Sequence, residues 1–227
     1  MSGPRDRGPL TIVIDGPAGS GKSTVARRVA QSLDITLLDT GAIYRAVALA
    51  ARRAGVAWHD GGHLAGVAAG LQLEFRLEGE RNRVLLGGED VSDAIREPQI
   101  SSGASQVSAL PEVRRALLEL QRGFAARGPL VAEGRDLGTV VFPDAALKIF
   151  LLARPEERAR RRAAELASAG RPAPVEQVRR EQDARDSADS GRAVAPLRAA
   201  PDAITVDTSD LSIDEVVARV LALIPSR

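Results

Sequence analysis

The sequence has no cysteine, two histidines and few aromatic side chains: one Trp, one Tyr and four Phe in 227 residues. Without cysteine it can form neither disulfides nor thiolate metal sites, which weakly favours the cytoplasm. No apolar run approaches the ~20 residues needed to span a bilayer, and the opening MSGPRDRGP lacks the apolar segment of a signal peptide. A formal net charge of +1 and the scarce aromatics disfavour nucleic-acid binding. We therefore expect a cytoplasmic protein with neither a membrane nor a nucleic acid as partner.

Lysine is nearly absent as well. Of the 31 lysines and arginines, only Lys22 and Lys148 are lysines. A single arginine therefore carries little information in this chain, whereas a lysine retained against that bias carries more. Lys22 lies in the glycine-rich segment DGPAGSGKST, residues 15–24.

Short apolar segments alternate with amphipathic helices along most of the chain. The expected strands are buried, β-branched runs at 10–15, 35–38, 130–134, 148–153 and 203–207. Helical spacing of apolar residues covers 23–33 and 42–54. A last helix begins with a capping-box pattern at Ser212 and Glu215 and runs to Pro225. This alternation predicts an α/β fold with a parallel sheet covered on both faces.

Two segments interrupt the alternation. Residues 56–103 contain LQLEFRL and NRVLLGGEDVS, which alternate and carry glycine turns, and so predict a small antiparallel insertion. Residues 155–191 are strongly charged, have few large apolar residues and predict mobile helices joined by the loop SAGRPAP. The expected organisation is a flexible arm at 1–9, a core formed by 10–55, 104–154 and 192–227, the insertion at 56–103 and the charged helices at 155–191.

Residues 16–23, GPAGSGKS, fit the pattern G-x-x-x-x-G-K-[ST] in full. The glycines let successive backbone N–H groups turn inward as a nest for anions, and the helix that follows points its positive end at the same place. In this pattern the lysine, here Lys22, reaches the β- and γ-phosphates, and the hydroxyl, here Ser23, can bind Mg²⁺. The alternative is a glycine-rich turn that binds nothing, but the strand before it, the helix after it and the rare lysine argue against that. The sequence thus predicts a site for a nucleoside triphosphate.

This loop does not by itself distinguish a switch, a motor or a kinase. The chain has no N-K-x-D motif for reading guanine, and it is shorter than most motor domains. A kinase would need a second site for its acceptor at the carboxyl ends of neighbouring strands, where ligands of open α/β sheets collect.

Two further strands end in clusters of arginine, carboxylate and glycine. The second expected strand runs into DTG at 39–41, with Tyr44 and Arg45 one turn later. The third ends in EGRD at 133–136, which contains Arg135. If the two strands lie on one side of the P-loop strand, Arg45 and Arg135 converge on one anion. Arginine suits a phosphate there, because its planar guanidinium group binds phosphate in a bidentate manner. Alternatively, each Arg–Asp pair is a structural salt bridge, and the sequence leaves this open.

A third group of charges lies in RDSADSGR, where Arg185, Asp189 and Arg192 end the charged segment. A charge run is usually a solvated face. This one comes directly before the apolar stretch AVAPL, so a lid hinged there could carry guanidinium groups over transferring phosphates.

Together these blocks resemble the bacterial cytidylate kinases of the P-loop nucleoside monophosphate kinase family. The matching segments, in family order over residues 10–224, are IDGPAGSGKST, LLDTGAIYRAVAL, GEDVSDAIR, ASQVSALPEVRRALLELQR, EGRDLGTVVFPDAALKIFL, RDSADSGRAVAPL and DTSDLSIDEVV. The P-loop is shared by many NTPases, whereas DTGAIYR, GRDLGTVVFPDA and the RD-x-x-D-x-x-R block are far more specific. The resemblance implies a five-stranded parallel sheet of order 2-3-1-4-5, with 56–103 as an NMP-binding insertion and 155–191 as a helical lid.

The resemblance also implies a role for individual residues. ATP would be held by Gly16, Pro17, Ala18, Gly19, Ser20, Gly21, Lys22, Ser23 and Thr24, with Arg154, Arg158 and Arg162 of the lid facing its phosphates and Ser23 as the metal ligand. The CMP phosphate would be held by Arg45, Arg135 and Arg192, the ribose approached by Thr40, Arg185 and Asp189, and the cytosine read by Ser105, Arg114 and Asp136. Tyr44 is counted with these substrate-binding residues, and Lys22, Arg135 and Arg192 are the implied catalytic residues.

Two departures from the family pattern stand out. Some relatives have Ser where this chain has Ala18, which removes one hydroxyl contact to the acceptor phosphate. The usual Asn before the last arginine of the RD block is Gly191 here. Neither position carries a charge, so the departures bear on fine geometry and not on the reaction.

The reaction that the resemblance implies is transfer of the γ-phosphoryl group of ATP, with Mg²⁺, to CMP and dCMP, in pyrimidine nucleotide metabolism, by a monomer. An acceptor phosphate is mostly dianionic at neutral pH, so no general base is needed, which suits a chain with two histidines and no cysteine. A UMP/CMP kinase or another nucleoside monophosphate kinase remains open, as does a non-catalytic nucleotide-binding regulator. Release of ADP with different acceptors would separate these.

Overall fold

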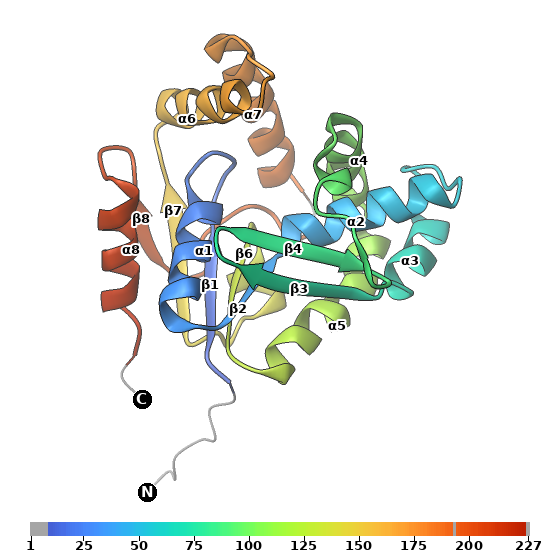
Figure 1. Cartoon of the computed structure of the whole chain (residues 1–227), viewed down its shortest axis with the longest axis horizontal. Helices are drawn as coiled ribbons and strands as arrows, with labels where there is room; N and C mark the ends of the chain where they lie inside the picture. The colour runs from blue at the N-terminus through green and yellow to red at the C-terminus, as the bar shows by residue number, and fades with distance from the viewer. Residues whose placement is uncertain (1–8, 193, 226–227) are drawn as a thin grey trace, which may run out of the picture. The chain divides into compact units, whose positions relative to one another are not determined.

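The computed structural model describes residues 9–192 and 194–225. The strands of its larger sheet are β1 (Thr11–Asp15), β2 (Thr36–Asp39), β6 (Leu130–Gly134), β7 (Leu147–Leu152) and β8 (Ile204–Asp207). Their order is β2-β6-β1-β7-β8 (Figure 1), which is the predicted order 2-3-1-4-5. The predicted α/β fold class, with a five-stranded parallel P-loop sheet, is therefore confirmed.

The three central strands, β6, β1 and β7, were readable from sequence because their burial is nearly complete, whereas the edge strands β2 and β8 are only partly buried. All five residues of β1 and of β6 are buried, as are five of the six residues of β7. Parallel strands covered on both faces are continuous apolar runs, and such runs located every strand of this sheet to within one residue at each end. Of the helices in the described residues, none has the length and apolar character that a membrane crossing requires.

The described residues form two compact units. The first comprises 9–11 and 30–133, and the second comprises 12–29, 134–192 and 194–225. The predicted division into core, NMP-binding insertion and lid stays a prediction. The predicted flexible arm at 1–9 falls almost wholly outside the described residues, which begin at Pro9.

In the first unit β2 pairs in parallel with β6, from Thr36 opposite Leu130 to Asp39 opposite Glu133. The helices are α2 (Thr40–Arg53), α3 (Gly61–Ala69), α4 (Pro98–Ala109) and α5 (Pro111–Arg127), with a short 3-10 helix, η1 (Ala94–Arg96). Helix α2 packs against α3 and α4, and α3 packs against α5. Helix α2 begins two residues earlier than predicted because the Asp39 side chain caps it, accepting the N–H of Ala42 at 2.9 Å.

The first unit also contains the predicted antiparallel sheet. Its strands are β3 (Leu73–Glu78), β4 (Arg81–Leu86) and β5 (Glu89–Asp90), in the order β3-β4-β5. Both pairings are antiparallel, which confirms the prediction from the alternating pattern. Helix α3, which precedes this sheet, was not predicted, because its sequence GGHLAGVAA contains three glycines and has no clear amphipathic pattern.

In the second unit β7 lies between β1 and β8 and pairs with both in parallel. Helix α1 (Lys22–Leu33) starts here, and a π-helical turn, η2 (Leu137–Val141), follows β6. The predicted helices in the charged segment are confirmed as α6 (Pro155–Ser168) and α7 (Val175–Ser190), which lie against each other (Figure 1). Their mobility stays a prediction.

The last helix, α8 (Ile213–Ala222), has the predicted capping box. The Ser212 hydroxyl accepts the N–H of Glu215 at 3.3 Å, and the Glu215 carboxylate accepts the N–H of Ser212 at 2.8 Å. The helix ends at Ala222, three residues before Pro225, because a helix closes before a proline that cannot continue its hydrogen bonds.

Candidate active site

The glycine-rich loop between β1 and α1 has the backbone geometry of an anion nest. Gly16, Gly19 and Gly21 have φ of +152°, +77° and +88°, values that side-chain-bearing residues rarely adopt. A Cβ on Gly16 would lie 2.3 Å from the carbonyl oxygen of Leu151, and one on Gly19 would lie 2.9 Å from that of Arg158. Gly16 and Gly19 are therefore required for space as well as for conformation, and Gly21 for conformation alone.

Lys22 is the first residue of α1 and is buried. Its ammonium group donates to the carbonyl oxygen of Pro17 at 3.0 Å, so the charge lies at the loop itself. The first turn of α1 contains no acidic residue, so nothing in that turn neutralises the positive end of the helix. The nest, the helix terminus and Lys22 together favour a bound polyphosphate.

Asp15, the last residue of β1, was not predicted as a site residue. Its carboxyl group accepts the N–H groups of Leu137 at 3.1 Å and Gly138 at 2.8 Å. Its pKa is raised from 3.8 to about 7: burial is the largest cause and the nearby charge of Asp136 adds to it, whereas the two N–H donors and Lys22 act in the opposite direction. Asp15 directly precedes the P-loop, and these two hydrogen bonds hold the turn after β6 against it. An acidic residue ending a fully buried strand was the signal that could have revealed it.

Arg135, Asp189 and Arg192 come together in the second unit. The Asp189 carboxylate is 4% exposed and forms ion pairs with Nε of Arg135 and Nη2 of Arg192. The sequence left open whether Arg135 pairs with its neighbour Asp136, and in the structure the ion pair is made with Asp189 on α7. Two guanidinium groups around one carboxylate leave an excess of positive charge, which is the balance that a phosphate site needs.

The arginines assigned to the predicted lid have different surroundings. Arg158 is buried, donates through Nη1 to the carbonyl oxygen of Ala18 at 2.9 Å and pairs with Asp186 of α7. Arg154 and Arg162 are about half exposed and pair with carboxylates on the surface, Arg154 with Asp210 and Arg162 with Glu165. Arg185 is exposed on α7. Of these four arginines, the structure brings Arg158 to the P-loop, and contact of any of them with a nucleotide stays a prediction.

The first unit contains the cluster predicted after β2. Arg45 pairs with Asp39 at 2.7 Å, and the same carboxylate caps α2. The hydroxyl of Thr40 donates to the carbonyl oxygen of Glu133 at 2.7 Å. The cap and the ion pair fix Arg45 one turn into α2, so the Arg–Asp pair has a structural role whatever else it binds.

Arg114 lies over the ring of Tyr44 in the same unit. Its guanidinium carbon is 5.5 Å from the ring centroid, and its Nη1 donates to the carbonyl oxygen of Ser108 at 3.1 Å. Ser105 lies on α4, where its hydroxyl is 3.4 Å from the carbonyl oxygen of Ser101. The third residue assigned to cytosine, Asp136, is buried in the second unit, so a joint site for the base stays a prediction.

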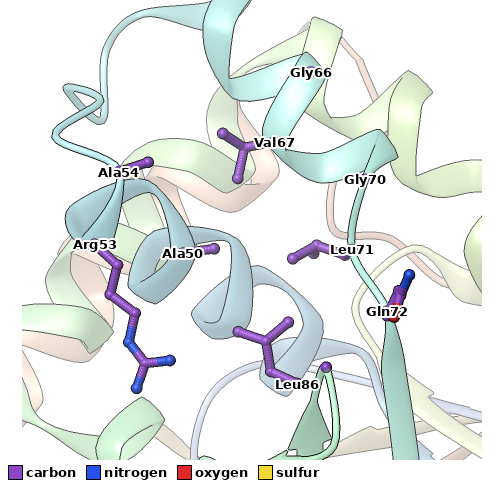
Figure 2. Close-up of a pocket in the computed structure, with 10 residues that line it drawn as sticks. Ala50, Arg53, Ala54, Gly66, Val67, Gly70, Leu71, Gln72 and Leu86 are labelled. Atoms are coloured by element: carbon purple, nitrogen blue, oxygen red, sulfur yellow. The ribbon is translucent and has the colours of Figure 1, made fainter.

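A separate hollow of ≈ 540 Å³ in the first unit was not predicted (Figure 2). Its walls come from α2, α3 and the antiparallel sheet and include Val67, Leu71 and Leu86. Among the described residues that line it, the charged side chain is Arg53, which Glu89 holds in a bidentate pair at 2.8 Å. The described lining therefore offers no free cation for a phosphate.

A strand that ends in a glycine nest, a lysine at the start of the next helix and partly buried arginine clusters on a five-stranded parallel sheet define a P-loop phosphotransferase. The chain belongs to the cytidylate kinase family, whose model matches residues 12–226.

Sequence comparisons agree along nearly the whole chain. The chain is 50% identical over 218 residues to the cytidylate kinase of Syntrophotalea carbinolica, covering 96% of this chain and 93% of the relative. It is 51% identical over 221 residues to the cytidylate kinase of Azotobacter vinelandii, covering 96% of both. An uncharacterized protein from Eubacterium ventriosum shares the fold, with a TM-score of 0.53 and 13% identity, covering 96% of this chain and 99% of that one.

Proposed function

We propose that this chain transfers the γ-phosphoryl group of ATP to CMP, and to dCMP, and so produces CDP or dCDP together with ADP. One observation carries the proposal: a buried Lys22 at the anion nest of a chain that belongs to the cytidylate kinase family over residues 12–226. In the reaction an oxygen of the CMP phosphate attacks the γ-phosphorus, and the bond to the β–γ bridging oxygen breaks.

The donor is held by the P-loop. Backbone N–H groups of the loop from Gly16 to Thr24, except at Pro17, which has none, bind the phosphates of ATP, and Lys22 neutralises the β- and γ-phosphates. Lys22 is well placed for this role because its ammonium group already lies at the loop. Arg158, which contacts the same loop, is the lid arginine best placed to influence the donor.

Mg²⁺ would be held by the hydroxyl of Ser23 and by phosphate oxygens. The described residues contain no group of three His, Cys, Asp or Glu side chains that could hold a metal ion. One hydroxyl and several phosphate oxygens suit Mg²⁺, which is commonly bound through few protein ligands plus substrate phosphates. When bound, the ion neutralises charge on the transferring phosphoryl group.

The acceptor phosphate is held by Arg45, Arg135 and Arg192. The ion pairs of Asp189 already hold two of these guanidinium groups around one anion, and a phosphate dianion offers more oxygen acceptors than the carboxylate does. Thr40, Tyr44, Arg185 and Asp189 serve the nucleoside. Because the attacking phosphate has a second pKa near ~6, it needs no general base, and the rate comes from positioning and charge neutralisation.

Base selection depends on Ser105, Arg114 and Asp136. Cytosine presents an amine donor beside two acceptors, so the Asp136 carboxylate accepts from the amine and Arg114 donates to the ring acceptors. Uracil replaces the amine with a carbonyl, which would face the lone pairs of Asp136. Sites built on one hydrogen bond reject analogues that lack it by up to ~10⁴-fold, so CMP is strongly preferred over UMP.

The enzyme acts as a cytoplasmic monomer with nucleotides as its partners. A coupled assay of ADP release, with ATP, Mg²⁺ and in turn CMP, dCMP, UMP, AMP and GMP, tests the proposal. We expect turnover with CMP and dCMP far above that with the other three. ATP binding without CMP-dependent ADP release would instead identify a nucleotide-binding regulator, and preference for another acceptor would identify a different monophosphate kinase.

A further inference from the structure

Two carbonyl groups of the P-loop are held from outside the loop. The carbonyl oxygen of Ala18 accepts from Nη1 of Arg158 at 2.9 Å. The carbonyl oxygen of Ser20 accepts from the hydroxyl of Thr208 at 3.1 Å. Gly19 lies between these two anchor points, so the loop is restrained on both sides of its tightest turn.

Thr208 is 2% exposed and directly follows β8. Its hydroxyl accepts from Nη1 of Arg161 at 3.0 Å, and its carbonyl oxygen accepts from Nη2 of the same arginine at 2.6 Å. A hydroxyl has one proton to donate. The carbonyl of Leu152 is also in reach at 3.0 Å, but it already accepts the N–H of Thr208 at 2.8 Å. The carbonyls of Ser20 and Leu152 both lie within reach of this proton, and donation to Ser20 links the end of β8 to the P-loop. Arg161 donates to the hydroxyl oxygen and so leaves the proton of the hydroxyl for these carbonyls.

The carbonyl of a trans peptide and the N–H of the next residue point in opposite directions. A hydrogen bond that draws the Ser20 carbonyl towards Thr208 therefore directs the N–H of Gly21 the other way. The Arg158 bond to the Ala18 carbonyl does the same for the N–H of Gly19. Glycine needs such external restraint more than any other residue, because no side chain limits its backbone.

We infer that Thr208 and Arg161 are positioning residues of the triphosphate site: they orient the Ser20–Gly21 peptide so that the Gly21 N–H faces the phosphates. Arg161 thereby serves the backbone of the loop and is not one of the guanidinium groups that contact the nucleotide. The inference rests on the proposed use of the P-loop for ATP.

Thr208→Val removes the hydroxyl with little change in shape, and Thr208→Ser keeps it. We expect Val to raise the KM for ATP about tenfold, the effect of losing one buried hydrogen bond, while the KM for CMP changes less than about twofold. Ser should restore the KM for ATP to near the wild-type value. Binding of inorganic tripolyphosphate, measured by calorimetry without CMP, should weaken by the same factor in Val and recover in Ser.

Arg161→Gln and Arg160→Gln form a matched pair. Both arginines lie on α6 and pair with Glu157, at 3.2 Å for Arg161 and 3.1 Å for Arg160, but only Arg161 has hydrogen bonds to Thr208 among the contacts of the described residues. Arg161→Gln should reproduce the Thr208→Val effect, and Arg160→Gln should match wild type.

The inference is overturned if Thr208→Val binds tripolyphosphate as wild type does, or if the KM values for ATP and CMP rise together. It is also overturned if Arg160→Gln and Arg161→Gln behave alike. A wild-type protein that binds tripolyphosphate but does not phosphorylate CMP would refute the proposed function instead, and the binding series would still decide the role of Thr208.

Discussion

The carboxyl group of Asp15 accepts the backbone N–H of Gly138 at 2.8 Å, in a buried setting that raises its pKa to about 7. In the unfolded chain the same group titrates at 3.8. Between these values the folded state holds one more proton than the unfolded state. The stability contributed by this group is therefore fully present below pH 3.8 and is lost as the pH rises through about 7.

Asp15→Asn should remove this pH dependence, because the amide does not titrate. Each unit of pKa difference corresponds to about 1.4 kcal/mol, so between pH 5 and pH 8 wild type should lose about 2–3 kcal/mol of unfolding free energy relative to the variant. Urea unfolding of both proteins at the two pH values measures this difference in unfolding free energy. A wild-type-minus-variant difference that does not change with pH would show that Asp15 is ionised throughout in the folded protein.

Lys22→Ala should reduce kcat by at least ~100-fold, since charge neutralisation on the transferring group is most of the catalysis. The fold should survive, because the hydrogen bond from the Lys22 ammonium group to the Pro17 carbonyl contributes only about 1 kcal/mol. Turnover with saturating ATP and CMP, beside a circular dichroism melt, measures both. Near-normal turnover would remove Lys22 from the mechanism.

Asp136→Ala should narrow the preference for CMP over UMP, because the carboxylate that accepts from the cytosine amine is gone. We expect the ratio of kcat/KM for CMP to kcat/KM for UMP to fall at least ~10-fold, mostly because the value for CMP decreases. Asp144→Ala, at an exposed aspartate in the same unit, is the control and should leave the ratio unchanged. If Asp136→Ala keeps the wild-type ratio, another residue reads the base.

Gly103→Ala should destabilise the first unit. A Cβ at this position of α4 would lie 2.5 Å from the ring of Trp58, whose Nε1 is held by the carbonyl of Ala48 at 3.0 Å. Overpacking of this kind costs about 1–3 kcal/mol. Gly123→Ala is the matched control: it also lies in a helix, α5, and its Cβ would meet nothing within 4 Å.

Chemical denaturation of the two glycine variants checks this pair. Gly123→Ala should be neutral or stabilising by up to ~1 kcal/mol, since alanine is the better helix former. Equal stability of the two variants would mean that the Trp58 ring moves aside without cost.

Local patterns predicted the parts of this protein that depend on neighbours in the chain. The P-loop was readable because its glycines, lysine and hydroxyl are contiguous, and α8 because its capping box is four residues long. The strand order came from the family resemblance, since apolar runs alone do not say which strands are adjacent. Helix α3 escaped prediction because tertiary packing stabilises a glycine-rich segment that local propensity disfavours.

The sequence by itself determined the buried strands, the anion nest and the charges available to a phosphate. Only the tertiary structure decided which charges meet: Arg135 pairs with Asp189 rather than with its neighbour Asp136, and Thr208 holds the carbonyl of Ser20 across 188 positions of the chain. The physical reason is that such contacts form when the sheet and the helices on it are assembled, and their partners carry no periodicity or spacing that links them beforehand.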